Sequence, residues 1–226
     1  MEFLVNNRLL TKARTALSQR RNLYWLLGRS GAGKTTVCRL LAEQTGLPIY
    51  DMDAHIYGSY HGRFTADHPV NRAWADAPNG LAWLLQMPWE TFNQFNQATL
   101  PEYLDLLAAD LEGPDYARGV LIDGGICNPA LLSQVTPVAQ LVCLAAPEQS
   151  SAQVWEAGGE RSEMKLFIDQ LPHPEELWRK FLEFDARITE TIWQESRACG
   201  IPICIRNRED STEAFARRVG QTLGIM

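Results

Sequence analysis

The sequence predicts an α/β domain in which a five-stranded parallel sheet has helices on both faces. Short apolar runs, typical of strands buried on both sides, alternate with longer segments of helical periodicity. Strands that alternate with helices form parallel sheets, because each crossover between parallel strands needs a connection of about a helix in length. The chain has 226 residues, of which 46% are hydrophobic and 21% charged. This suits a single domain, residues 1–226, with its own core.

The first part of the pattern is a helix, a strand, a helix and a strand. Residues 3–19 have helical periodicity, and the candidates for one buried face are Leu4, Leu9, Leu10 and Leu17. Residues 23–27 are a short apolar run that ends at a glycine-rich turn. Residues 35–45 are helical up to the following glycine, and 48–52 form a second short strand. Residues 59–115 are the least strand-like stretch, and we expect them to form a helical insert.

The second part supplies three further strands and two helices. Residues 120–123 form a strand that two glycines terminate, and 140–145 form another that ends just before a proline. A long helix over 175–198 follows a polar segment. Residues 202–206 are the fifth strand, and 211–223 the closing helix, whose first residue is a serine that can cap it.

The loop between the first strand and the second helix carries a specific motif. Gly28 to Thr35 matches G-x-x-x-x-G-K-[ST] at every fixed position, with a strand before it and a helix after it. Such a phosphate-binding loop (P-loop) turns several backbone amides toward phosphate oxygens, and the next helix directs its positive end there. We therefore expect ATP or GTP, with Lys34 on the β- and γ-phosphates and the Thr35 hydroxyl on Mg²⁺. The predicted nucleotide-binding residues of the loop are Gly28, Ser30, Gly31, Ala32, Gly33, Lys34, Thr35 and Thr36.

Two further motifs follow the next two strands. Together with the P-loop, Asp51-x-Asp53 after the second strand and Asp123-Gly124-Gly125 after the third resemble the shikimate kinase and gluconate kinase group of small P-loop phosphotransferases. More distant relatives are nucleoside and nucleoside monophosphate kinases. The resemblance covers the five-strand core and not the insert at 59–115. It implies a P-loop NTPase fold. It also implies an enzyme that transfers phosphate from ATP·Mg²⁺ to a hydroxyl.

The resemblance assigns roles to these positions. It implies that Asp53 contacts the acceptor hydroxyl and that Asp51 supports Mg²⁺. A carboxylate near the γ-phosphate is also a suitable base for that proton. Because the two aspartates alternate at a strand end, we expect their side chains to point to opposite sides. The amides of Gly124 and Gly125 would hold the substrate, and Asp123 would support Mg²⁺ through water, as in a Walker B strand.

Relatives also have a lid after the fourth strand and a clasp for the base after the fifth. The lid corresponds to 147–175, where Arg161 is the expected catalytic arginine beside the transferring phosphate. Arg179 and Arg187 are the second choices. The resemblance also implies that Arg206 stacks on the base, although a plain surface loop is an equal alternative there.

The insert is where the acceptor would be recognised. It contains three of the seven tryptophans, Trp74, Trp83 and Trp89. We predict a substrate lobe in which one of these rings lines a pocket for a planar or ring-shaped acceptor. The alternative is a helical cap whose tryptophans only fill a core. The long aromatic insert and the missing arginine pattern for a carboxylate ring argue against shikimate itself.

Composition limits the remaining possibilities. The formal net charge of −6 argues against nucleic acid as the main partner. The five cysteines form no Cys-x-x-Cys pair, which favours a reducing cytoplasm, and no apolar run is long enough to span a membrane. The oligomeric state is open.

These observations favour a small-molecule kinase. In many hydrolytic ATPases a glutamate follows the Walker B aspartate, and here Gly124 stands in that position, which favours transfer over hydrolysis. The alternative from another class is a regulatory or switch NTPase without an acceptor. A kinase that acts on nucleic-acid ends would need a basic groove, which the charge does not favour.

Overall fold

The core of the molecule is a five-stranded sheet in the order β2-β3-β1-β4-β5, with every neighbouring pair parallel. The computed structural model describes residues 2–157 and 162–226. The strands are β1 (Leu23–Leu27), β2 (Ile49–Asp51), β3 (Val120–Asp123), β4 (Leu141–Ala145) and β5 (Ile203–Ile205). The predicted parallel α/β sheet is confirmed, and each strand lies within the range expected for it.

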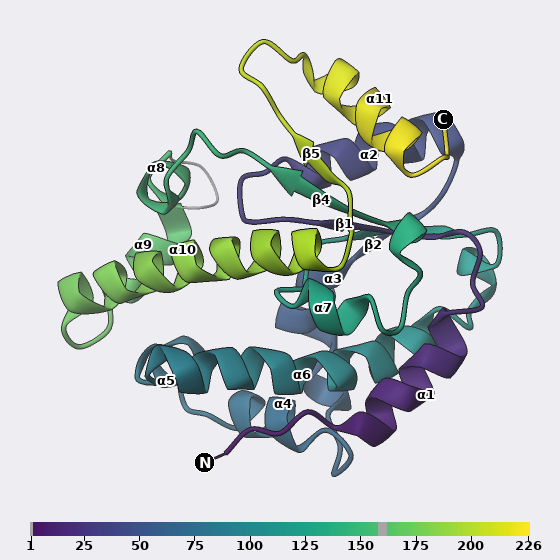
Figure 1. The fold of residues 1–226 in the computed structure, drawn as a ribbon. Coiled ribbons are helices and arrows are strands. Elements are labelled where there is room, and N and C mark those ends of the chain that lie inside the picture. Colours follow the sequence, from purple (N-terminus) through teal and green to yellow (C-terminus); the bar gives the residue numbers. More distant parts are fainter. Residues whose placement is uncertain (1, 158–161) are drawn as a thin grey trace.

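Helices occupy both sides of this sheet, as Figure 1 shows. Four long or well-formed helices match the prediction closely, and the insert supplies a series of shorter ones around one long helix. The helices are α1 (Asn7–Leu17), α2 (Lys34–Thr45), α3 (Met52–Ala54), α4 (Pro69–Ala75), α5 (Gly80–Leu85), α6 (Trp89–Asp110), α7 (Pro129–Leu132), α8 (Ser151–Trp155), α9 (Ser162–Ile168), α10 (Pro174–Ala198) and α11 (Thr212–Thr222), with a π-helical turn at His55–Ser59 and 3₁₀ turns at His61–Arg63, Pro114–Tyr116 and Val138–Gln140.

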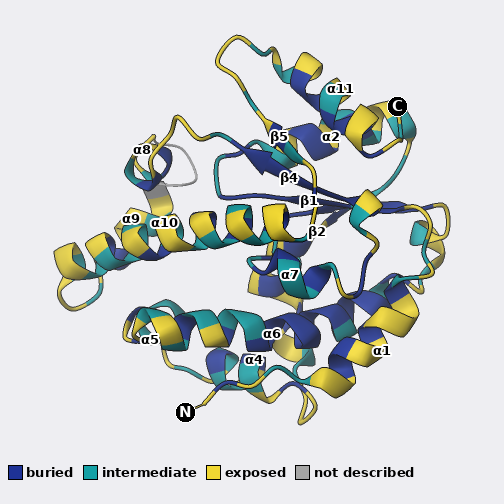
Figure 2. Cartoon of the chain, in the orientation of Figure 1, coloured by how far each residue is buried: buried dark blue, intermediate teal, exposed yellow. Residues whose placement is uncertain are grey.

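Two hydrophobic layers flank the sheet. The smaller one lies under α2 and α11, where Val37, Leu41 and Phe215 pack on the faces of β1, β3 and β4. The larger one lies on the opposite side, where α1, α6, α7 and α10 cover the sheet. Figure 2 shows the buried residues concentrated in the strands and on the inward surfaces of these helices. The strands are buried on both faces, which is why they appear in the sequence as short continuous apolar runs.

The first helix is shorter than its periodicity predicts. Asn6 accepts a hydrogen bond from the Leu9 amide at 3.2 Å and caps α1, so the helix begins at Asn7. Leu9, Leu10 and Leu17 are buried as expected, but Leu4 is exposed. The prediction of Leu4 as a core residue is therefore wrong, because Leu4 lies before the cap and outside the helical face.

The insert is helical, as predicted, and it joins the larger hydrophobic layer. Its long helix α6 packs against α1, and Pro101 lies within α6. At the start of α4, the buried carboxylate of Glu102 accepts hydrogen bonds from the Val70 and Asn71 amides at 3.0 and 2.8 Å. These bonds satisfy donors that a helix terminus leaves unpaired, so they tie the short helix to the long one.

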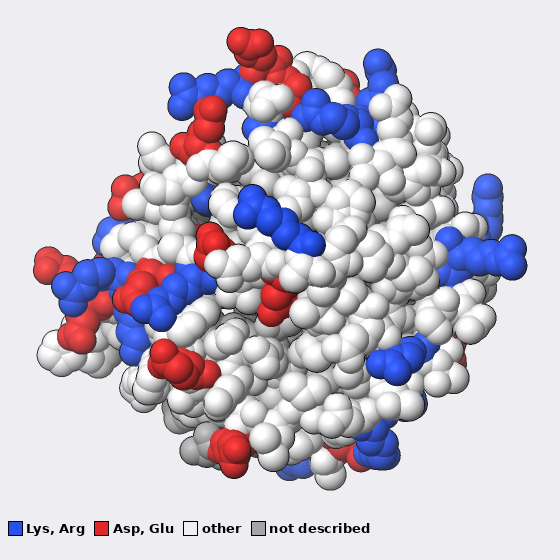
Figure 3. Space-filling view, in the orientation of Figure 1, with Lys and Arg blue, Asp and Glu red and all other residues white. Residues whose placement is uncertain are grey.

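The charged residues are distributed without a single dominant sign on the face shown in Figure 3, where basic and acidic side chains surround a broad uncharged area. Among residues 2–157 and 162–226, no helix combines the length and the apolar character needed to cross a bilayer.

Candidate active site

The P-loop lies at the carboxyl end of β1, between the sheet and the first turn of α2. Gly28 has φ 136°, and a Cβ placed on it would lie 2.4 Å from the Leu144 carbonyl oxygen of the neighbouring strand. No other residue fits so close to β4 with that backbone. Gly33, with φ 89°, is the left-handed residue from which α2 begins.

Lys34, the first residue of α2, bends back over the loop. Its ammonium donates to the carbonyls of Gly28 at 3.0 Å and Arg29 at 3.1 Å. Thr35 and Thr36 are exposed in the first turn of α2, and Ala32 is buried beneath the loop. The amino end of α2 and the Lys34 charge together form an anion-binding surface.

The turn after β3 lies beside this lysine. Trp25 of β1 donates its indole N–H to the Gly124 carbonyl at 3.0 Å, and the Gly124 amide donates to the Leu26 carbonyl at 3.3 Å. A buried tryptophan therefore fixes the position of the Asp123-Gly124-Gly125 turn. A Cβ on Gly124, which has φ 69°, would lie 2.8 Å from Oδ2 of Asp53 and 3.2 Å from Cε of Lys34.

Asp53, Lys34 and Gly124 thus converge at one point. Asp53 is an exposed residue, although protein atoms surround its carboxyl group on most sides. This burial raises the pKa of Asp53, and the negative charges of Asp123 and Asp51 raise it further, while Lys34 and the Gly125 amide act in the opposite direction. The arrangement places a carboxylate with elevated basicity next to the lysine of the P-loop.

The strand-alternation argument for the two aspartates is wrong. Strand β2 ends at Asp51, and Asp53 lies in the short helix α3 that begins at the next residue. Asp51 caps this helix by accepting the Ala54 amide at 3.0 Å. The strand ends before Asp53 because an aspartate at a strand end readily becomes the N-cap of a following helix. The helical turn, rather than a pleat, separates the two carboxylates.

The residues predicted to support Mg²⁺ lie at adjacent strand ends. Asp51 of β2 is in register with Asp123 of β3, and Thr35 lies beside Asp123. Asp123 is 4% exposed, and its Oδ1 is buried without a hydrogen-bond partner among the described residues. Burial raises the pKa of Asp123, whereas the Thr35 hydroxyl and the charge of Lys34 lower it. An orphaned buried carboxylate oxygen beside a threonine hydroxyl fits a hydrated Mg²⁺.

The described residues include no group of three or more His, Cys, Asp and Glu that would hold a metal by itself. In phosphotransfer sites Mg²⁺ usually keeps several waters and is held by one or two carboxylates together with the phosphates of the substrate.

The acceptor side of the cleft contains groups that the sequence analysis did not single out. Tyr57 is 72% exposed as a residue, but burial of its hydroxyl raises its pKa, and the charges of Asp53 and Cys127 raise it further. Burial also raises the pKa of Tyr103, with smaller contributions from Tyr57 and Cys127. Burial raises the pKa of Cys127 to about 12. The position of Cys127, two residues after the Gly-Gly turn, was a usable signal, but no sequence pattern marks the tyrosines.

Of the three insert tryptophans, only Trp74 contacts this group. Its ring meets Tyr57 edge-on with centroids 5.9 Å apart. Trp83 packs instead in an aromatic cluster with Phe3 and Phe95, with centroids 6.0 and 5.5 Å away. Trp74 is a buried member of the larger hydrophobic layer, and Trp83 is half-buried against that layer. Trp74 stays the candidate for the acceptor pocket because its ring meets Tyr57.

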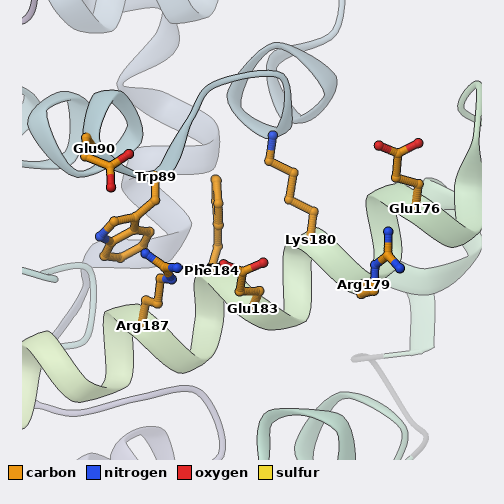
Figure 4. Close-up of a pocket in the computed structure, with 8 residues that line it drawn as sticks. All are labelled: Trp89, Glu90, Glu176, Arg179, Lys180, Glu183, Phe184 and Arg187. Carbon is orange, nitrogen blue, oxygen red and sulfur yellow. Dashed lines mark ion pairs between the residues drawn. The ribbon is translucent and has the colours of Figure 1, made fainter.

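Trp89 belongs to a separate pocket of about 300 Å³ between the start of α6 and one face of α10. Figure 4 shows the Arg187 guanidinium against the Trp89 ring, and Arg179 farther along α10. Arg187 lies 5.4 Å from the centroid of this ring and pairs with Glu183 at 3.0 Å. No residue of the P-loop lines this pocket, so these two arginines are not placed at the phosphates.

A second cleft, of about 520 Å³, lies directly beside the P-loop. Its lining includes Gly31, Gln149, Gln153, Arg206 and Arg208. A Cβ on Gly33 would lie 3.5 Å from Nη1 of Arg206, whose Nη2 donates to Thr212 at 3.2 Å. The structure thus brings Arg206 to the rim of the P-loop, where a nucleoside would extend from the phosphates.

The predicted lid starts with α8 and continues through α9. Arg161, the arginine expected at the transferring phosphate, lies outside the described residues.

Comparison with known proteins finds solved structures with a similar fold but no match to a family model or to a curated protein. Among solved structures, TT1252 from Thermus thermophilus is similar, with a TM-score of 0.50 and 19% identity over 91% of this chain and 98% of that one. A shikimate kinase from Bacteroides thetaiotaomicron gives 0.46 and 18% over 90% and 98%. A shikimate kinase from Acinetobacter baumannii, in complex with shikimate, gives 0.43 and 21% over 92% and 95%.

The five-stranded parallel sheet, with the glycine-rich loop between β1 and α2, is the arrangement of a P-loop NTPase fold, and the likeness to TT1252 extends over this fold. With identities of 18–21%, the likeness concerns the fold alone. The activity must be argued from the site.

Proposed function

We propose that this protein is a phosphotransferase that moves the γ-phosphoryl group of ATP or GTP to a hydroxyl of a small molecule. One observation carries the proposal: the carboxylate of Asp53 and the side chain of Lys34 converge on the same turn, at Gly124. A P-loop alone serves kinases, switches and hydrolases alike. A carboxylate next to its lysine adds what transfer to a hydroxyl requires, a proton acceptor for the attacking group.

The roles of the residues follow from their positions. The amides of the P-loop and Lys34 hold the phosphates and balance the charge that develops on them. Asp53, with its pKa raised, orients the acceptor hydroxyl and takes its proton. Gly124 and Gly125 carry no side chain, so an acceptor can approach their amides. Thr35, Asp123 and Asp51 would hold Mg²⁺, which neutralises phosphate charge when bound.

The acceptor would bind between Asp53 and the group of Tyr57, Trp74, Tyr103 and Cys127. The nucleoside would occupy the cleft on the other side of the P-loop, against Arg206. Donor and acceptor would then meet at the γ-phosphate position beside Lys34.

A transfer screen tests the proposal. The protein is incubated with γ-labelled ATP or GTP, Mg²⁺ and panels of nucleosides, sugars, amino alcohols and small hydroxy acids. Label should appear on at least one acceptor, and Asp53→Asn should suppress it. A protein that binds nucleotide and hydrolyses it slowly, with no acceptor found and no effect of Asp53→Asn, would instead be a switch NTPase.

A further inference from the structure

Arg29, at a variable position of the P-loop motif, is a buried arginine with an unusual set of partners. Only 5% of the residue is exposed. Its Nη1 donates to the Gln149 carbonyl at 2.6 Å and its Nη2 to the Ser150 carbonyl at 3.2 Å, while Nε donates to the Ser30 carbonyl at 3.2 Å. A guanidinium is buried only where its donors are satisfied, so these bonds determine the geometry around it.

The two distant carbonyls belong to the chain that enters α8. Ser150 is the N-cap of α8 and forms a capping box with Gln153. A cation gains nothing from a helix N-terminus, because the helix dipole is positive there. An interaction with the dipole of α8 therefore does not explain why Arg29 lies at this helix end. The contact instead holds the start of α8 against the P-loop, and it joins residues 120 positions apart in the chain.

Arg29 also contacts the phosphate-binding lysine. Its carbonyl accepts a hydrogen bond from Lys34 at 3.1 Å. The same residue thus touches Lys34 through its main chain and α8 through its side chain. Gln149 and Gln153, which lie where this contact is made, line the cleft beside the P-loop together with Arg206.

We propose that Arg29 is a positioning residue that forms the α8 wall of the nucleotide cleft and couples occupancy of the P-loop to the order of α8. The inference rests on the proposed function only in requiring that a nucleotide binds at the P-loop. Phosphates compete with the Gly28 and Arg29 carbonyls for the three donors of Lys34. Nucleotide binding therefore changes the hydrogen bonding of Arg29, and its guanidinium passes this change to the residues that cap α8.

Three variants test the coupling. Arg29→Met removes the donors but keeps much of the apolar stem. Arg29→Lys keeps the charge but cannot bond two carbonyls with a planar fork. The matched control is Arg14→Met, because Arg14 also donates to a backbone carbonyl, that of Gln134 at 2.7 Å, but in an exposed contact remote in sequence from the P-loop and α8.

The measurements are the affinity for Mg²⁺ with a non-hydrolysable ATP or GTP analogue and hydrogen–deuterium exchange of peptides that cover 148–157. In the wild type and in Arg14→Met, the analogue should protect α8. In Arg29→Met, affinity should fall by about 10- to 100-fold. At saturating analogue, this variant should regain protection in the P-loop but not in α8. For Arg29→Lys, both the affinity and the protection of α8 should lie between those of the wild type and those of Arg29→Met.

The outcomes separate this inference from the proposed function. Wild-type affinity and wild-type protection of α8 in both Arg29 variants would overturn the coupling while leaving the kinase proposal standing. If Arg29→Met does not fold, the same comparison on Arg29→Lys decides. A wild-type protein that binds neither analogue would contradict the proposed function itself, whatever the variants do.

Discussion

The proposed donor side and the proposed acceptor side of this site are built in different ways. The phosphate-binding part of the donor side is one continuous segment, 28–36, in which glycines with positive φ and one lysine produce an anion site through local geometry. The acceptor side gathers Asp53, Tyr57, Trp74, Tyr103 and Cys127 from separate segments of the chain. The first is encoded by spacing in the sequence, and the second exists only after the insert has packed on the sheet.

Because of this difference, substitutions on the two sides should affect activity in different ways. Phosphate is the same in every nucleotide, so a local motif that binds it can be shared by proteins with unrelated tasks. The acceptor is what distinguishes one kinase from another, and under the proposed function its recognition would depend on tertiary contacts of residues 52–127. Substitutions on the donor side should therefore abolish all activities together, whereas those on the acceptor side should separate transfer from nucleotide binding.

Lys34→Ala should have the largest effect. Transfer should fall by about 10⁴-fold or more, because the phosphates lose their main cationic partner in the transition state. The fold should persist, since the hydrogen bonds of the ammonium within the described residues go to two carbonyls of the P-loop itself. Transfer assays and circular dichroism check both points. Full activity, or an unfolded variant, would contradict the assignment of the P-loop.

Asp53→Asn should separate the two sides. Loss of the general base should lower transfer by about 10²–10⁴-fold, or roughly 3–5 kcal/mol of barrier, with nucleotide affinity nearly unchanged. Asp51→Asn is the matched control, because an asparagine still caps α3 while losing the charge. It should raise the Mg²⁺ concentration needed for activity. If Asp53→Asn transfers phosphate at the wild-type rate, the acceptor side has been misassigned.

The same contrast explains what the sequence could predict. The five strands, the P-loop and the glycine turn after β3 depend on local rules, and we located them from spacing and apolar runs alone. Leu4 and the Asp51–Asp53 geometry failed because single capping residues, Asn6 and Asp51, reset where helices begin. Tyr57 and Tyr103 were not predicted because nothing near them in the sequence distinguishes them from core tyrosines.

Asp123→Asn should alter stability and its pH dependence. Burial raises the pKa of Asp123 above its ordinary value of 3.8, so the folded protein holds this proton more tightly than the unfolded chain. The stability of the wild type therefore falls as the pH rises through the range between the two values, and the loss persists at neutral pH. Asparagine carries no charge, so the ligand-free variant should melt higher than the wild type at pH 7.

The expected gain is a few degrees, since about 1 kcal/mol corresponds to roughly 2–4 °C for a chain of this size. The gain should shrink near pH 4, and Mg²⁺ with nucleotide should stabilise the variant less than the wild type. Thermal melts at both pH values, with and without ligand, measure all three effects. A variant less stable than the wild type at pH 7 would contradict the account of Asp123 as a buried carboxylate whose Oδ1 has no hydrogen-bond partner among the described residues.

The smallest effect distinguishes the two insert tryptophans. Trp74 is 7% exposed and meets Tyr57, whereas Trp83 lies in the Phe3–Phe95 cluster. Each is replaced by phenylalanine, and tryptophan fluorescence is titrated with the acceptor found in the transfer screen. The acceptor-dependent change should disappear in Trp74→Phe and persist in Trp83→Phe, because only the first ring is linked through Tyr57 to Asp53. If the signal is lost in Trp83→Phe alone, the acceptor binds near the cluster of Trp83, Phe3 and Phe95. The distinction between Trp74 and Trp83 would then be wrong.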